Sequence, residues 1–168
     1  RYLEQGTGKP LANPEDGKGR YGAVISEAAI PIEDYDPVAP TSQTLNIRIE
    51  ASQTEAKLNV ITFYYQEKTV AIHYQVVGPD GCGTVTLASE TVKVLSGIAN
   101  GSTATASSEE YRFVGWYSDA ACTNQVSADS KYVPEKVDGK NVAATYYAKF
   151  EPNQGSLTIE KTVVGGVE

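Results

Sequence analysis

The sequence has no methionine, one histidine, one tryptophan and two cysteines among its 168 residues. Because there is no initiator methionine, the chain that starts at Arg1 is interpreted as a fragment of a longer protein. A transmembrane helix needs an apolar run of at least about 18 residues, and the chain contains no such run. We therefore expect this fragment to make no contact with a membrane.

The scarcity of histidine and cysteine argues against an enzyme and against a zinc protein. Ser-His-Asp and Cys-His catalysis both need a nucleophile and an orienting group beside the histidine. His73 is instead predicted to face solvent on an alternating strand. Two cysteines and one histidine cannot complete a four-ligand zinc site without carboxylates. We predict a protein with no enzymatic activity, cofactor or metal.

Basic residues are also scarce, with 14 Lys and Arg against 21 Asp and Glu and a net charge of -7. This balance argues against a nucleic acid partner, which would need a basic face. The acidic segment 33–36 is interpreted as a solvated turn. Calcium binding is the alternative, but the segment lacks the spacing of an EF-hand loop. The glycine-containing segments 6–8 and 78–83 lack the Gly-Lys-Ser/Thr of a phosphate-binding loop.

Strand patterns are abundant. Hydrophobic residues make up 40% of the chain, enough for a packed core, and they often alternate with polar ones. Leu45, Ile47 and Ile49 are predicted to face inward on one strand. Strands are predicted at 2–4, 44–50, 58–65, 70–77, 85–87, 90–95, 102–108, 110–117, 131–134 and 142–150, with a strand that ends in a helical turn at 22–30.

Turn signals and aromatic residues complete the pattern. Asn100-Gly101 and Asp138-Gly139 predict two-residue hairpin turns. Trp116 lies on a predicted strand after Phe113 and Gly115, and we predict that it anchors the core of its module. Both halves open with a tyrosine-containing strand, continue into a turn with two glycines and close on a paired-tyrosine strand. We therefore expect two small modules in tandem, at 1–67 and 68–152, that fold separately.

Particular motifs resemble known families. YLEQGTGKPL at 2–11, IEDYDPV at 32–38 and NVITFYY at 59–65 resemble a mucin-binding-type (MucBP) repeat, although Asp34 replaces the usual glycine before Tyr35. GSTATA at 101–106, YRFVGWYSD at 111–119 and ATYYAKF at 144–150 resemble an internalin B-repeat. LTIEKTV at 157–163 resembles the first strand of a pilin-like Cna B-type domain. Residues 153–168 would then be a linker and the start of a truncated next domain.

These resemblances imply a fold and a setting. They imply mainly β, β-grasp-like α+β modules from a multi-domain surface protein of Gram-positive bacteria, attached to the cell wall through the parent protein. Lys161 would be the isopeptide lysine of the next domain. In an oxidising extracellular setting, Cys82 and Cys122 are predicted to form a disulfide, with two free thiols as the alternative.

The expected function is that of a monomeric, non-catalytic stalk or spacer in an adhesin, whose partners are neighbouring modules of the same chain. Direct adhesion to host mucin, glycan or extracellular protein is the alternative. It would use surface tyrosines, although tyrosine is also common on half-exposed sheet faces. An enzyme ranks last.

Overall fold

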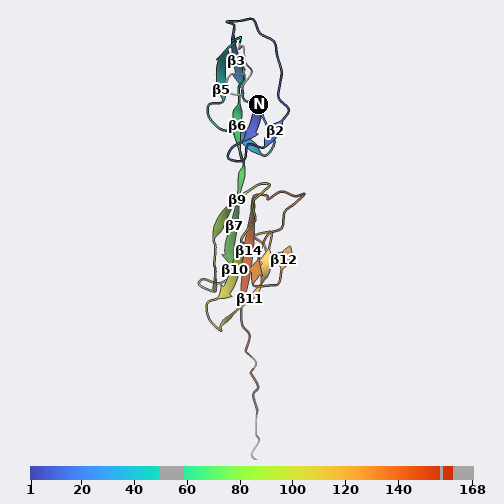
Figure 1. Ribbon diagram of the computed structural model, residues 1–168. Helices are drawn as coiled ribbons and strands as arrows, with labels where there is room; N and C mark the ends of the chain where they lie inside the picture. Colours follow the sequence, from blue (N-terminus) through green and yellow to red (C-terminus); the bar gives the residue numbers. More distant parts are fainter. Residues whose placement is uncertain (50–58, 156, 161–168) are drawn as a thin grey trace, which may run out of the picture. The chain divides into compact units, whose positions relative to one another are not determined.

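The structure is a computed structural model that describes residues 1–49, 59–155 and 157–160 (Figure 1). Within these ranges it consists of strands, turns and irregular segments, and it has no helix. The prediction of a mainly β protein is confirmed. The α+β character expected of β-grasp-like modules is wrong for the described residues. The helical turn predicted near residue 30 is also wrong, because β3 (Val24–Ala28) ends before Pro31 in irregular chain.

Contacts between Cα atoms divide the chain into two compact units. The first unit comprises Arg1–Ala71, Thr91–Ala99 and Glu135–Ala143, and the second comprises Ile72–Glu90, Asn100–Pro134 and Ala144–Glu168. The first unit therefore includes two segments from the C-terminal half of the sequence. The predicted folding boundary between residues 67 and 68 stays a prediction.

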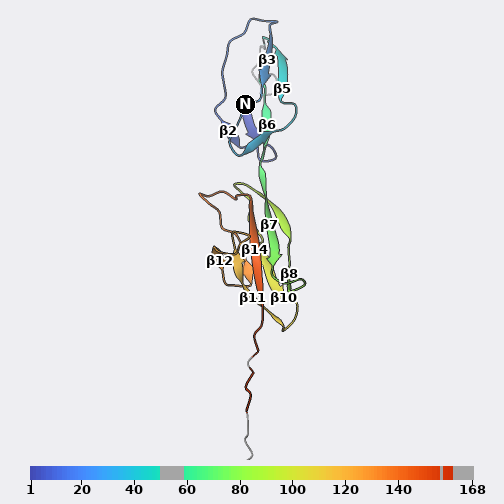
Figure 2. The same ribbon diagram turned by 180° about the vertical axis from the view of Figure 1, so that it is seen from behind.

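The first unit contains a four-stranded sheet and a two-stranded sheet. The four-stranded sheet has the order β2-β1-β6-β4, and β1 runs parallel to β6 with Tyr2 opposite Phe63. Its core is aromatic, formed by Tyr2, Tyr35, Phe63 and Tyr65. The small sheet is an antiparallel pair of β3 and β5, which lie side by side in Figures 1 and 2. The strands not yet bounded are β1 (Tyr2–Glu4), β2 (Pro10–Ala12), β4 (Tyr35–Pro37), β5 (Ser42–Asn46) and β6 (Phe63–Glu67).

The second unit is built on a sheet with the order β12-β11-β14-β7-β9 and a smaller one with the order β13-β10-β8. β14 is central in the large sheet, antiparallel to β11 and parallel to β7. In both views β7 and β14 lie side by side (Figures 1 and 2). The bounds are β7 (Thr69–Val77), β8 (Gly83–Val85), β9 (Ser89–Lys93), β10 (Ser102–Ala106), β11 (Tyr111–Tyr117), β12 (Gln125–Ser127), β13 (Lys131–Tyr132) and β14 (Ala144–Pro152).

An irregularity in β11 positions the tryptophan. Phe113 pairs with Phe150 and Trp116 with Ala148, while the register shifts between Phe113 and Gly115. In a regular strand, Phe113 and Trp116 would point to opposite faces because side chains alternate. The extra residue brings both rings to one face, as a β-bulge does. Their ring centroids lie 6.2 Å apart.

Two further predictions are corrected by the structure. Ile49 is 80% exposed, because β5 ends at Asn46 and the alternation beyond it does not continue as a strand. Asn100-Gly101 is not a hairpin turn, because β9 and β10 on either side of it belong to different sheets. Asp138-Gly139 does form a tight turn, with positive φ at both residues and a bridge between Val137 and Lys140.

Among the described residues there is no helix long and apolar enough to cross a membrane. Of the strand predicted at 157–163, residues 157–160 are described and do not form a strand, and residues 161–163, including Lys161, lie outside the described residues.

Candidate functional site

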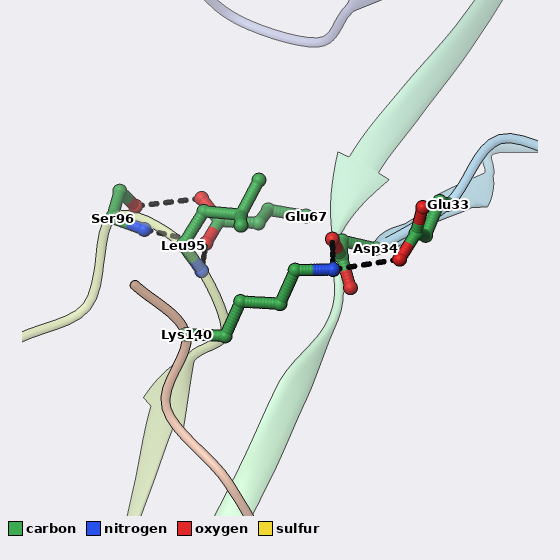
Figure 3. Close-up of polar contacts among 6 residues, drawn as sticks. All are labelled: Glu33, Asp34, Glu67, Leu95, Ser96 and Lys140. Atoms are coloured by element: carbon green, nitrogen blue, oxygen red, sulfur yellow. Dashed lines mark hydrogen bonds and ion pairs between the residues drawn. The ribbon is translucent and has the colours of Figure 1, made fainter. Parts of the chain in front are cut away.

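A cluster of polar groups in the first unit surrounds Glu67, the last residue of β6 (Figure 3). This carboxylate is only 7% exposed. It accepts hydrogen bonds from the backbone N–H of Leu95, from the backbone N–H of Ser96 at 2.7 Å and from the Ser96 hydroxyl at 2.6 Å. A buried carboxylate is stable only when its oxygens are paired in this way. Glu67 therefore fixes the 91–99 segment to the end of β6.

A second cluster of charges holds the 135–143 segment within the same unit. The Lys140 ammonium lies 2.7 Å from Glu33 Oε1 and 2.6 Å from Asp34 Oδ2 (Figure 3). Lys140 follows the Asp138-Gly139 turn, and Asp34 is held at φ 61° in its own turn. The acidic segment predicted to be a solvated turn thus supplies two partners for a lysine distant in sequence.

The pKa shifts of Glu67 and Lys140 are those of charged groups that already have hydrogen-bonding partners. Burial on its own raises the pKa of Glu67, but the hydrogen bonds from Ser96 and Leu95 outweigh it, and the pKa lies below its usual value. Hydrogen bonds to Asp34 and Glu33 raise the pKa of Lys140. Both shifts favour the charged, paired forms, so neither group resembles a general base poised near neutral pH.

The second unit contains a carboxylate with a similar set of donors, which is only partly buried. Glu90 accepts hydrogen bonds from the Tyr74 hydroxyl at 2.7 Å, from Asn100 N–H at 2.8 Å and from Gly101 N–H at 3.0 Å. Burial raises the pKa of Tyr74, and the bond to Glu90 raises it further. The tyrosine therefore stays a neutral donor. Here too the carboxylate fixes a loop, the Asn100-Gly101 segment that the sequence suggested as a hairpin.

A shallow groove of about 360 Å³ in the first unit lies beside Glu67. Its charged lining mixes both signs, with Lys68 and Lys93 beside acidic side chains, and its other lining residues are polar. Ligand sites are usually walled by apolar and aromatic side chains with a few polar groups converging on the ligand. None of the lining residues is aromatic. The groove does not define a ligand.

The predicted core anchor is buried. Trp116 is 0% exposed, and its indole N–H donates to the Ser130 carbonyl at 2.9 Å. Tyr74 meets it edge to face at 5.8 Å, with Phe113 and Tyr132 at 6.2 Å. A buried indole needs a partner for its N–H, and the Ser130 carbonyl provides one.

The predicted disulfide is not formed. Cys82 is a buried free thiol, and Cys122 is a free thiol of intermediate exposure. Cys82 follows β7, whose last residue Val77 is level with Lys149, and Cys122 follows the end of β11. The chain leaves β7 beside Lys149 and leaves β11 beside Tyr147, in opposite directions and on opposite sides of β14. The turn-rich sequence around both cysteines could not predict these positions, because they depend on the order and direction of distant strands.

The structure also places the remaining residues considered in the sequence analysis. His73 is exposed, as expected from the alternation of β7. No group of three or more His, Cys, Asp or Glu that could hold a metal ion occurs in the part of the chain that the structure describes. Sequence reasoning missed Glu67, Glu90 and Lys140, because their partners are distant in sequence and no local motif marks them.

Comparison with known proteins adds no assignment. No family model matches the chain, and neither does any curated protein or solved structure. The function is therefore inferred from the chain itself.

Proposed function

We propose that this chain is a non-catalytic spacer segment of a bacterial cell-surface protein, which holds another part of that protein away from the cell wall. The observation that carries the proposal is the parallel pairing of β1 with β6 and of β7 with β14. The chain enters each pair at the start of one strand and leaves it at the end of the other. In a parallel pair these two points lie at opposite ends of the sheet. Each pair therefore adds length between the preceding and the succeeding parts of the chain.

The use of the polar groups supports a structural role. The carboxylates of Glu67, which is buried, and of Glu90, which is partly buried, accept hydrogen bonds from backbone and hydroxyl donors. Lys140 forms ion pairs with two acidic side chains, Glu33 and Asp34. A reaction centre needs a nucleophile or base whose lone pair is available to a substrate. These groups instead hold loops in place.

The motif resemblances supply the proposed setting. The MucBP-like, internalin B-repeat-like and Cna B-type-like motifs favour an extracellular segment anchored to the cell wall through its parent protein. In that setting the partners are neighbouring modules of the same chain, and the segment acts as a monomer.

Direct adhesion to host mucin, glycan or extracellular protein is the second candidate. Its specific support is the exposure of two tyrosines of the first unit, Tyr21 at 73% and Tyr64 at 47%. Tyrosine rings can stack on the apolar faces of sugars while the hydroxyl remains in water.

A binding experiment separates the two candidates. The chain and its Tyr21→Ala/Tyr64→Ala variant would be applied to a glycan array, immobilised mucin and host matrix proteins. A spacer is expected to give no saturable binding with either protein. Saturable binding that the double variant loses would overturn the spacer proposal and establish the adhesive one.

A further inference from the structure

The two parallel strand pairs have a mechanical consequence, and this inference rests on the proposed spacer function. A spacer under tension is pulled from its two ends. The force then acts at the start of β1 and the end of β6, and likewise at the start of β7 and the end of β14. Because the paired strands run parallel, the pull slides one along the other. All hydrogen bonds between them carry the load together. Antiparallel strands pulled from the same end would lose their bonds one at a time.

The two pairs differ in length. The β1–β6 pair has three residues in register, from Tyr2 opposite Phe63 to Glu4 opposite Tyr65. The β7–β14 pair has six, from Ile72 opposite Ala144 to Val77 opposite Lys149. A load shared by more hydrogen bonds needs a larger force to break them.

Side chains strengthen the longer pair further. Tyr74 lies directly opposite Tyr146, with stacked rings whose centroids are 6.2 Å apart. β14 is also flanked on its other side by β11, which holds six of its residues in register. Just past β7, a Cβ on Gly78 would lie 2.7 Å from the Phe150 carbonyl oxygen, so the backbones meet closely there. By contrast, the neighbour of β1 on its other side is the three-residue strand β2.

We propose that the chain is a two-stage tension element in which the β1–β6 pair yields first and the β7–β14 pair holds. Opening of the first pair would release the chain from the start of β1 to the end of β6. This corresponds to about 240 Å of extended polypeptide at roughly 3.6 Å per residue. The spacer would lengthen under moderate load while the second unit stays folded around its aromatic core.

Single-molecule force spectroscopy on the whole chain, held by tags at its two ends, tests the proposal. Two opening events are expected. The lower-force event should release about 240 Å and the higher-force event about 300 Å, which assigns them to the segments closed by β1–β6 and by β7–β14. At one force, the second event should be at least about tenfold slower, because each additional backbone hydrogen bond contributes a factor of about two to ten.

A control changes only the direction of pulling. Handles on Glu109→Cys and Gln154→Cys, in a Cys122→Ala background, pull β11 and β14 from their shared end, where Tyr111 faces Pro152. This geometry peels the antiparallel pair, so the second unit should open at clearly lower force than under end-to-end pulling. Both handle positions are exposed and lie outside the strands.

The outcomes distinguish this inference from the function on which it rests. If the longer release came first, if both events occurred at the same force, or if the peeling geometry were equally strong, the two-stage element would be overturned. The spacer function would survive each of these results. Saturable mucin binding would overturn the spacer function and leave the measured forces unchanged.

Discussion

At the scale of single residues, each unit is stabilised by buried aromatic rings and by a carboxylate that accepts several hydrogen bonds. Trp116, Glu67 and Glu90 each have defined partners within their own unit. The sequence suggested that Trp116 is a core residue, because a large aromatic ring on an alternating strand is usually buried. It could not suggest the carboxylates, because a glutamate is usually exposed and nothing local marks the exceptions.

Replacing Trp116 with alanine should destabilise the second unit by about 3–5 kcal/mol, the usual cost of removing a buried aromatic side chain. Denaturant unfolding followed by circular dichroism measures the loss. Val126→Ala on β12 is the control, because Val126 is 37% exposed and its truncation should cost far less. A loss below about 1 kcal/mol for Trp116→Ala would mean that the ring does not support the core.

Glu67→Gln should weaken the first unit by about 1.5–3 kcal/mol, because hydrogen bonds to a charged acceptor are stronger than those to an amide. The pKa of Glu67 is lowered in the folded protein. Its stabilisation is therefore complete above the unfolded value of about 4.3 and is lost as pH falls through the folded one.

Urea unfolding of the wild type and of Glu67→Gln, followed by NMR signals of the first unit, measures this difference at several pH values. The gap should be widest at neutral pH and should close in acid. Glu109→Gln, an exposed carboxylate, is the matched control and should show no gap. A gap that is the same at every pH would contradict a role for the charge.

At the scale of elements, alternation predicted most strands but misplaced several ends. β7 and β11 were predicted nearly as they occur, because long alternating runs dominate their sequences. β2 and β12 were missed, since three-residue edge strands carry too little pattern to detect. The register shift in β11 was also invisible, although it decides which face receives Trp116.

The two turn signals show why local chemistry is not sufficient. Asp138-Gly139 and Asn100-Gly101 are equivalent by sequence. Gly101 adopts φ 72°, but its backbone N–H is bound to Glu90 instead of closing a hairpin. A Cβ on Gly101 would also overlap the Tyr132 carbonyl oxygen, so the glycine is needed for a close approach to a distant strand. Distant groups thus decide the conformation that the dipeptide permits.

Gly83→Ala should destabilise the second unit by about 1–3 kcal/mol through overpacking. A Cβ at this position would overlap the edge of the Phe150 ring, which is itself buried. Unfolding followed by Trp116 fluorescence measures the effect. Gly155→Ala is the control, because no atom lies within 4 Å of the position that its Cβ would take and its φ is outside the left-handed region. Equal stability of the two variants would show that Phe150 can move aside.

At the scale of the whole molecule, the sequence repeat predicted two modules, whereas the contacts place residues 91–99 and 135–143 with the first unit. No periodicity could reveal this, because the contacts are made by individual groups such as Glu67 with Ser96 and Asp34 with Lys140.

Separate expression of residues 1–67 and 68–152 should therefore give unequal products. Fragment 68–152 keeps Trp116 and its surrounding rings and is expected to unfold cooperatively. Fragment 1–67 lacks the partners of Glu67 and Asp34 and should be the less stable of the two. Chemical denaturation of both fragments measures this, and a fragment 1–67 as stable as the first unit of the whole chain would contradict the expectation.

The central claim is that the chain is a spacer. It is tested most directly by the height at which the chain holds an attached reporter above a surface. The chain would be placed between a surface anchor and a fluorescent reporter and compared with a Gly/Ser linker of equal length, whose end-to-end distance is about 70 Å. Axial single-molecule localisation measures the height of the reporter above the surface. The account predicts a greater height with a narrower distribution for the chain. A reporter as low and as broadly distributed as with the Gly/Ser linker would contradict it.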